Sequence, residues 1–222
     1  MSWNLQFPRA RFVIDQAHMD VDLESGPRCS VIDTGMVSQD PADQTLMAFE
    51  VAPAEATLPL NIEPLACRDA YVRESDLIAT YPQTYPWPFG YQVDFRYRSD
   101  MPGGIRAMEL WFSISTSLLE CNPKLHLLPR TRCRVQGSRH VAVAIHGRAA
   151  LMVHPLDQAD CEVVPASDFQ GVGHWDVFGG FMEKGVIRRA RFLLAWSGSA
   201  EPDSKWERAL DSFSESPLPL TA

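Results

Sequence analysis

The alternation of apolar and polar side chains is clearest between Tyr91 and Ser117. From Tyr91 to Arg98 the large apolar residues occupy odd positions and the polar residues even ones, a period of two that predicts a half-buried strand. The sequence Pro-Gly-Gly at 102–104 predicts a turn, and a second alternating segment runs from Ile105 to Ser117. The pattern therefore predicts an antiparallel hairpin with one apolar face and one polar face.

We expect Arg98 to pair with Ile105 across the turn, and this pairing sets the register of the hairpin. Asp94 then lies opposite Glu109, with their Cβ atoms about 4.5–5.5 Å apart. A slip of one residue would mix apolar and polar side chains on both faces, so the paired faces support this register. The polar face gathers the side chains of Gln92, Asp94, Arg96, Glu109, Trp111 and Ser113.

The segment from Tyr81 to Tyr91, which we call the aromatic loop, holds five aromatic residues and three prolines. Each proline restricts its own backbone and that of the residue before it, so the loop is predicted to be stiff. Two interpretations stay open. Tyr85 and Trp87 either present flat rings to a ligand, at a small entropic cost, or fold over the end of the core and plug it.

Other segments complete the predicted fold. Further strands are predicted at 9–14, 17–23, 46–51, 70–73 and 77–81, with hairpins formed by 139–146 with 149–154 and by 175–182 with 186–196. Residues 24–45 are rich in turn-forming residues and are expected to form a long surface connection. A short helix is predicted to begin at Asp203 and Ser204, because Trp206, Leu210 and Phe213 follow at helical spacing.

These elements define the predicted architecture. The absence of long amphipathic helices argues against parallel α/β folds. The chain of 222 residues is long enough for one sizeable core. We therefore expect an all-β, antiparallel two-sheet β-sandwich with a short C-terminal helix, as a single domain over residues 1–215 with a flexible tail at 216–222.

The composition argues against some classes of binding partner and favours one cellular location. The formal net charge of −8 argues against nonspecific binding to nucleic acid. No apolar stretch approaches the roughly 20 residues that cross a membrane, and the N-terminus lacks a basic and apolar signal segment. The five cysteines are dispersed, which favours reduced thiols and a cytoplasmic location. The oligomeric state is left open.

No cofactor or metal is predicted. The cysteines form no C-x-x-C pair, and the chain contains neither a phosphate-binding glycine loop nor a G-x-S-x-G or H-E-x-x-H motif. His18, Asp20 and Asp22 share one face of a predicted strand. Neighbouring side chains on that face lie nearly 7 Å apart, so one ion would not reach all three, and a solvated surface is expected.

The leading functional hypothesis is a protein that binds a sugar on an aromatic and carboxylate sheet face. Sugars are commonly bound with an apolar C–H face on an aromatic ring, while carboxylates and amides bond the hydroxyls. Trp111 on the polar face, beside the aromatic loop, offers such a ring. The expected partner is a small molecule or an oligosaccharide, and the predicted ligand-binding residues are Trp111, Gln92, Arg96, Ser113, Trp87 and Tyr85.

Two alternatives belong to other classes of protein. In a sugar-active enzyme of glycoside hydrolase or isomerase type, Asp94 and Glu109 would act as acid and base, since retaining glycosidases hold two carboxyl groups about 5 Å apart. In a structural or interaction module, exposed aromatic residues such as Tyr85 would contact another protein. Composition alone does not separate the three hypotheses.

Overall fold

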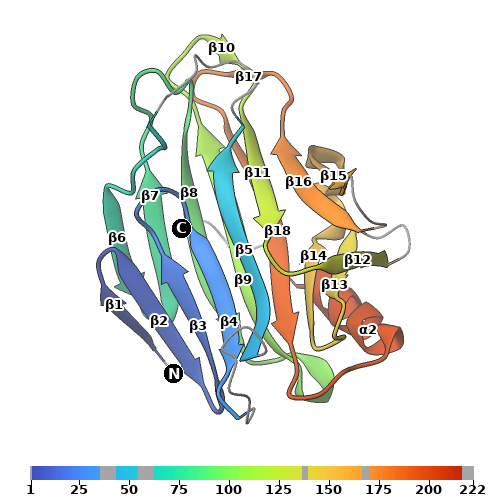
Figure 1. The fold of residues 1–222 in the computed structure, drawn as a ribbon. Coiled ribbons are helices and arrows are strands. Elements are labelled where there is room, and N and C mark those ends of the chain that lie inside the picture. The colour runs from blue at the N-terminus through green and yellow to red at the C-terminus, as the bar shows by residue number, and fades with distance from the viewer. Residues whose placement is uncertain (1, 36–43, 55–62, 137–139, 167–170, 217–222) are drawn as a thin grey trace.

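The period-two segments pair into two antiparallel sheets of eight strands, which the computed structural model stacks face to face (Figure 1). The structure describes residues 2–35, 44–54, 63–136, 140–166 and 171–216. The predicted all-β sandwich with a short C-terminal helix is confirmed. The predicted tail at 216–222 lies outside the described residues except for Ser216, whose hydroxyl donates to the carbonyl of Phe213 at 2.6 Å.

The first sheet has the strand order β1-β2-β3-β4-β5-β11-β16-β15. Its strands are β1 (Trp3–Gln6), β2 (Arg9–Ile14), β3 (Ala17–Asp22), β4 (Arg28–Asp33), β5 (Thr45–Pro53), β11 (Lys124–Pro129), β16 (Val172–Phe178) and β15 (Cys161–Pro165). In β2 the side chains of Ala10, Phe12 and Ile14 are buried, while those between them are exposed. The sequence alternation thus becomes one face toward the core and one toward solvent.

The second sheet has the order β12-β13-β14-β18-β9-β8-β7-β6. Its strands are β12 (Cys133–Gln136), β13 (Val141–Ala144), β14 (Ala149–Val153), β18 (Ile187–Trp196), β9 (Arg106–Ser115), β8 (Gly90–Arg98), β7 (Asp76–Tyr81) and β6 (Asp69–Arg73). Two short strands, β10 (Glu120–Cys121) and β17 (Met182–Glu183), pair separately. Short 3-10 helices are η1 (Pro102–Gly104) and η2 (Pro155–Asp160).

The main core fills the space between the two sheets. Burying this apolar surface away from water is the dominant contribution to the stability of such a sandwich. The largest fully buried side chains of this layer are Phe12, Phe49, Tyr81, Phe95, Phe112, Trp175, Phe192 and Trp196.

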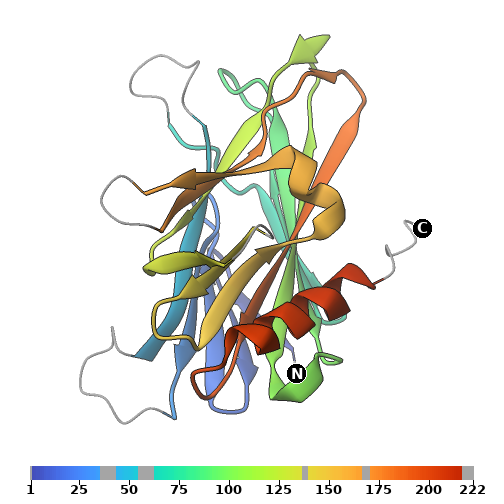
Figure 2. The same cartoon turned by 90° about the vertical axis from the view of Figure 1, so that its right-hand side faces the viewer.

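A second, smaller core lies on the outer face of the second sheet, where helix α2 (Asp203–Ser214) crosses it (Figure 2). The buried face of the helix consists of Trp206, Ala209, Leu210 and Phe213. These side chains share one hydrophobic cluster with β13, β14 and β18. The predicted helix is therefore confirmed. In the part of the chain that the structure describes, no helical segment has the length and hydrophobicity to span a membrane.

Two predictions about connections are wrong. The predicted connection at 24–45 contains a full strand, β4, because Cys29 and Val31 alternate with polar residues and are buried. Residues 36–43 of this segment lie outside the described residues. The segments 175–182 and 186–196 do not form a hairpin, since β16 lies in the first sheet and β18 in the second. Phe178 and Gly179 adopt φ values of 71° and 97°, so the strand ends there and the chain crosses between sheets. The hairpin of β13 and β14 is confirmed.

The predicted hairpin of β8 and β9 forms, but its register differs by two residues. Arg98 pairs with Ala107 rather than Ile105, so Glu109 lies opposite Arg96 and not opposite Asp94. Ile105 is buried in the second core near α2, which draws it out of the strand pairing and lengthens the turn. A shift of two leaves every side chain on its predicted face, because the side-chain period of a strand is two.

Candidate functional site

The polar side chains on the β8–β9 hairpin form two groups joined by hydrogen bonds. Gln92 Nε2 donates to Asp94 Oδ1 at 2.7 Å, and Arg96 donates to the other carboxylate oxygen of Asp94 at 3.0 Å. Trp111 Nε1 donates to Glu109 Oε2 at 2.8 Å. Five of the predicted polar-face side chains are thus held directly by one another. Ser113 lies opposite Gln92 in the register and shares their face.

The indole of Trp111 lies between two guanidinium groups. The Arg96 carbon Cζ is 4.5 Å from the ring centroid and that of Arg191 is 5.6 Å away. Both distances suit a cation–π contact. The Trp111 side chain is consequently only 5% exposed, so this predicted sugar platform is covered by arginines of its own chain.

Arg191 belongs to a group of residues that the sequence interpretation did not single out. Its Nε donates to Asp157 Oδ2 at 2.8 Å, and its Nη2 lies 2.9 Å from Nδ1 of His154. Asp157 lies on η2, and His154 immediately precedes it. The sequence offers one signal for Arg191: it alternates with Ala190 and Phe192 of the main core, which places it on the opposite face of β18. Its partners come from a different part of the chain.

The two predicted catalytic carboxylates are buried and fully engaged. Asp94 is bonded to Gln92 and Arg96, and Glu109 accepts from Trp111 and Arg98. They are not cross-strand partners, contrary to the predicted register. A general acid must reach the proton acceptor on its substrate. In this arrangement both groups instead fix side chains within the sheet face.

His154 is buried beside this network. Its Nδ1 accepts from the backbone N–H of Leu156 at 3.2 Å, and its ring packs edge-on against Phe213 with centroids 4.7 Å apart. Burial, and then the neighbouring positive charge of Arg191, lower the pKa of His154, while Asp157 and Glu109 act weakly in the opposite direction. The neutral imidazole is therefore the form that the fold stabilises.

We expect His154 to make the protein less stable as the pH falls below about 6.5, the pKa of an unperturbed histidine. The pKa is lower in the folded state, so between the two pKa values the unfolded chain binds more protons and the free energy of unfolding decreases with decreasing pH. Urea denaturation at pH 7.5 and 5.5 measures this. Other histidines with lowered pKa act in the same direction, so the comparison is between wild type and His154→Gln, which should lose less stability on acidification. Equal losses would contradict the assignment.

The outer face of the first sheet carries a hollow of about 620 Å³. Four of its charged lining side chains already pair with one another: Arg11 donates to Asp20 at 2.6 Å, and Arg130 donates to Glu50. Its one aromatic lining residue, Phe49, is buried. This hollow therefore lacks an exposed ring on which a sugar could stack.

Different residues of the aromatic loop fit the two interpretations, a plug over the core and an exposed surface for a ligand. Trp87 is only 6% exposed, and its indole nitrogen donates to the carbonyl oxygen of Glu63 at 2.9 Å. Tyr81, Phe89 and Tyr91 are likewise buried, so most of the loop closes one part of the core. Tyr85 is 100% exposed.

Tyr85 forms one wall of a hollow of about 470 Å³, which we call the loop hollow. The hollow is lined by Glu63, Pro64, Ala66, Arg68, Thr84, Tyr85, Pro86 and Trp87. Two of the predicted ligand-binding residues, Tyr85 and Trp87, meet here. The other four lie on the separate polar face described above.

A comparison of the chain with the profiles of known protein families and with curated protein sequences finds no match.

Proposed function

We propose that the protein binds a carbohydrate in the loop hollow, with the ring of Tyr85 as the stacking platform. The observation that carries the proposal is a fully exposed aromatic ring at the wall of a concave site that also holds a carboxylate, a guanidinium and a hydroxyl. This combination matches the two needs of sugar recognition, an apolar surface for the C–H face and charged or polar groups for the hydroxyls.

The loop that carries Tyr85 is held in place by hydrogen bonds of Trp87. Trp87 anchors the loop through its bond to Glu63, and its backbone N–H donates to the carbonyl of Thr84 at 2.7 Å, which closes a turn around Tyr85. Pro86 restricts the residue before it as well as itself. A loop held in this way has little freedom to lose on binding, which favours affinity.

The polar groups of the loop hollow are available to a ligand. Among the described residues, neither the carboxylate of Glu63 nor the guanidinium of Arg68 forms an ion pair or a side-chain hydrogen bond, and both residues are exposed. By contrast, the carboxylates of the β8–β9 face are taken up by arginines. The loop hollow therefore fits the proposal better than the face on which Trp111 lies.

Replacing Tyr85 with alanine should weaken glycan binding about 10- to 100-fold, the range for truncating an anchoring aromatic residue at a binding site. The measurement is retention on a glycan array, followed by titration calorimetry with the sugar that binds best. Because Tyr85 is exposed, the variant should keep its thermal stability. Tyr85→Trp should retain binding, since the platform is conserved.

The matched control is Leu119→Ala, which removes another strongly exposed apolar side chain, and it should leave binding unchanged. Trp111→Ala distinguishes the two surfaces: if it alone abolishes binding, the site is the β8–β9 face and not the loop hollow. Absence of glycan binding by the wild-type protein would overturn the proposal itself. The sugar-active enzyme and the interaction module stay predictions.

The proposed setting is the cytoplasm, with an oligosaccharide or small molecule as the ligand and no role for nucleic acid. The net charge of −8 supports the last point. All five cysteines are free, which supports a reducing compartment. Burial raises the pKa of the Cys133 thiol to about 12, so this thiol is kept in its unreactive protonated form.

A further inference from the structure

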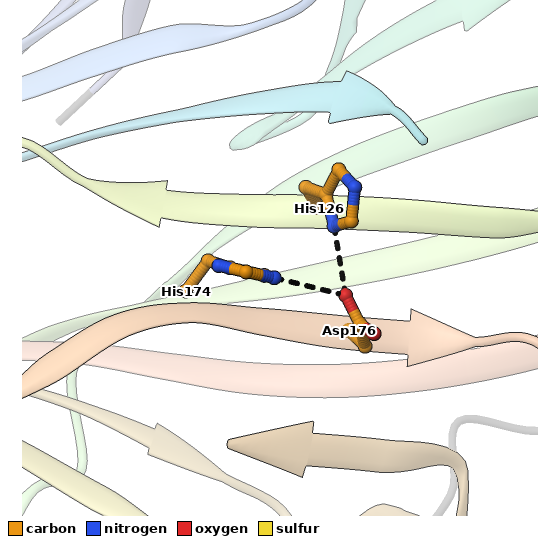
Figure 3. Close-up of side chains that lie close together, drawn as sticks. All are labelled: His126, His174 and Asp176. Carbon is orange, nitrogen blue, oxygen red and sulfur yellow. Dashed lines mark ion pairs between the residues drawn. The ribbon is translucent and has the colours of Figure 1, made fainter. Parts of the chain in front are cut away.

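Two histidines and an aspartate converge on the outer face of the first sheet (Figure 3). His126 comes from β11, and His174 and Asp176 come from the neighbouring strand β16. Nδ1 of His126 lies 2.8 Å from Oδ1 of Asp176, and Nε2 of His174 lies 3.2 Å from the same oxygen. All three donor atoms lie within 4.8 Å of one another.

The sheet itself positions these groups. His126 and Asp176 are directly paired across the two strands, and His174 precedes Asp176 by two residues, which places all three on one face. Trp175 between them is fully buried in the main core and fixes the orientation of the strand. On the other side of β11 the partner of His126 is Ala52, whose short side chain does not crowd the imidazole.

The contact between His126 and Asp176 is a close ion pair whose alignment is poor for a hydrogen bond. Nδ1 of His126 and Oδ1 of Asp176 are both buried atoms, and among the described residues neither atom forms a well-aligned hydrogen bond. Buried polar atoms are nearly always satisfied, and each exception calls for an explanation. Lys124 donates to Oδ2 of Asp176 at 2.7 Å, so it uses the opposite oxygen and leaves Oδ1 turned toward the imidazoles.

We infer that His126, His174 and Asp176 form a binding site for a divalent first-row transition metal ion such as Zn²⁺. Two imidazole nitrogens and one carboxylate oxygen form a ligand set suited to these ions rather than to Mg²⁺ or Ca²⁺, which prefer oxygen ligands. With metal–ligand bonds of about 2.0–2.2 Å, neighbouring donor atoms of a tetrahedral site lie about 3.3 Å apart. The two distances to Asp176 need to change by only tenths of an ångström to reach this spacing.

The ligand set also indicates what kind of metal site this is. Structural zinc sites use four protein ligands, whereas three protein ligands leave the ion a position for water or an external molecule. The carboxylate would bind through Oδ1 while Lys124 holds Oδ2, which orients the ligand in the way that supporting hydrogen bonds do at known metal sites. The inference is independent of the sugar proposal, because none of these residues lines the loop hollow.

Equilibrium dialysis of the purified full chain against ZnCl₂, with the bound metal measured by mass spectrometry, should find one ion per chain. His126→Ala and His174→Ala should each weaken Zn²⁺ binding at least about 100-fold. Losing a residue that only supports a metal ligand costs about 10- to 100-fold in affinity, and losing a ligand itself should cost at least as much. Co²⁺ as a second probe should give the visible absorption of a low-coordinate site. Excess Mg²⁺ should not compete.

His18→Ala is the matched control, because His18 lies 3.5 Å from Asp20 on the same face of the same sheet but outside the cluster, and it should leave binding unchanged. Asp176→Asn, of nearly the same shape, serves if an alanine variant does not fold by circular dichroism, and it should weaken Zn²⁺ binding as well. Absence of stoichiometric zinc in the wild type, or full binding by both histidine variants, would overturn the inference.

Discussion

Replacing Asp157 with alanine is expected to lower the free energy of unfolding by about 3–5 kcal/mol, the cost of removing one partner from a buried ion pair. The carboxylate of Asp157 accepts from the backbone N–H of Arg191 at 3.0 Å and from its side-chain Nε at 2.8 Å. The Arg191 side chain is only 4% exposed. Without Asp157 a positive charge stays buried against Trp111 and His154, and no other carboxylate among the described residues is bonded to it.

Chemical denaturation in urea, followed by circular dichroism, measures this loss. The double variant Asp157→Leu with Arg191→Met should be far more stable than Asp157→Ala, since replacing both members of a buried pair with apolar groups is often neutral. Asp160→Ala is the control on the same 3-10 helix: its contact with Arg188 is long and exposed, so its effect should stay within about 1 kcal/mol. A loss below 1 kcal/mol for Asp157→Ala would show that the pair is not buried in solution.

Trp206→Ala should cost about 3–5 kcal/mol, as expected when a large aromatic side chain is removed from a packed core. Trp206 is fully buried between α2 and the outer face of the second sheet. Its indole N–H has no hydrogen-bond partner among the described residues. Trp206→Phe should therefore lose clearly less than the alanine variant, because it keeps most of the packing and removes an unsatisfied donor.

The same experiment tests whether the helix belongs to a single domain over residues 1–215. Thermal unfolding of the wild type should give one transition, with coincident curves from far-ultraviolet circular dichroism and from fluorescence. Glu207→Ala, at the exposed neighbouring position, is the control and should change stability by no more than about 0.5 kcal/mol. A separate early transition for α2 would contradict the single-domain prediction.

The polar face of the β8–β9 hairpin has the residue types of a sugar-binding surface, but its aromatic ring, Trp111, is covered by arginine side chains. A strand pattern reports which side chains share a face, and Gln92, Asp94, Arg96, Glu109 and Trp111 do share one. The pattern does not show that a third strand, β18, places the guanidinium of Arg191 over this face. Arg191 on β18 lies directly opposite Trp111 on β9 and brings its guanidinium over the indole.

The proposed metal site, in contrast, was not predicted from the sequence. His126 and His174 stand far apart in the sequence and match no ligand spacing, so no motif search finds them. Only the pairing of β11 with β16 brings them together. The H-x-D spacing of His174 and Asp176 is the one local signal, since residues two apart on a strand share a face.

The sequence by itself determined the fold class, the apolar and polar faces of the β8–β9 hairpin, and the helix that carries Trp206. These follow from periodicities of two and 3.6 residues, which are local and can be read along the chain. The tertiary structure alone decided the two-residue register shift, the separation of β16 from β18, the covering of Trp111 and the meeting of His126 with Asp176. The last three depend on which distant strands become neighbours, whereas the register shift depends on the burial of Ile105 in the second core beside α2. All four are therefore set by packing between distant parts of the chain rather than by any one segment.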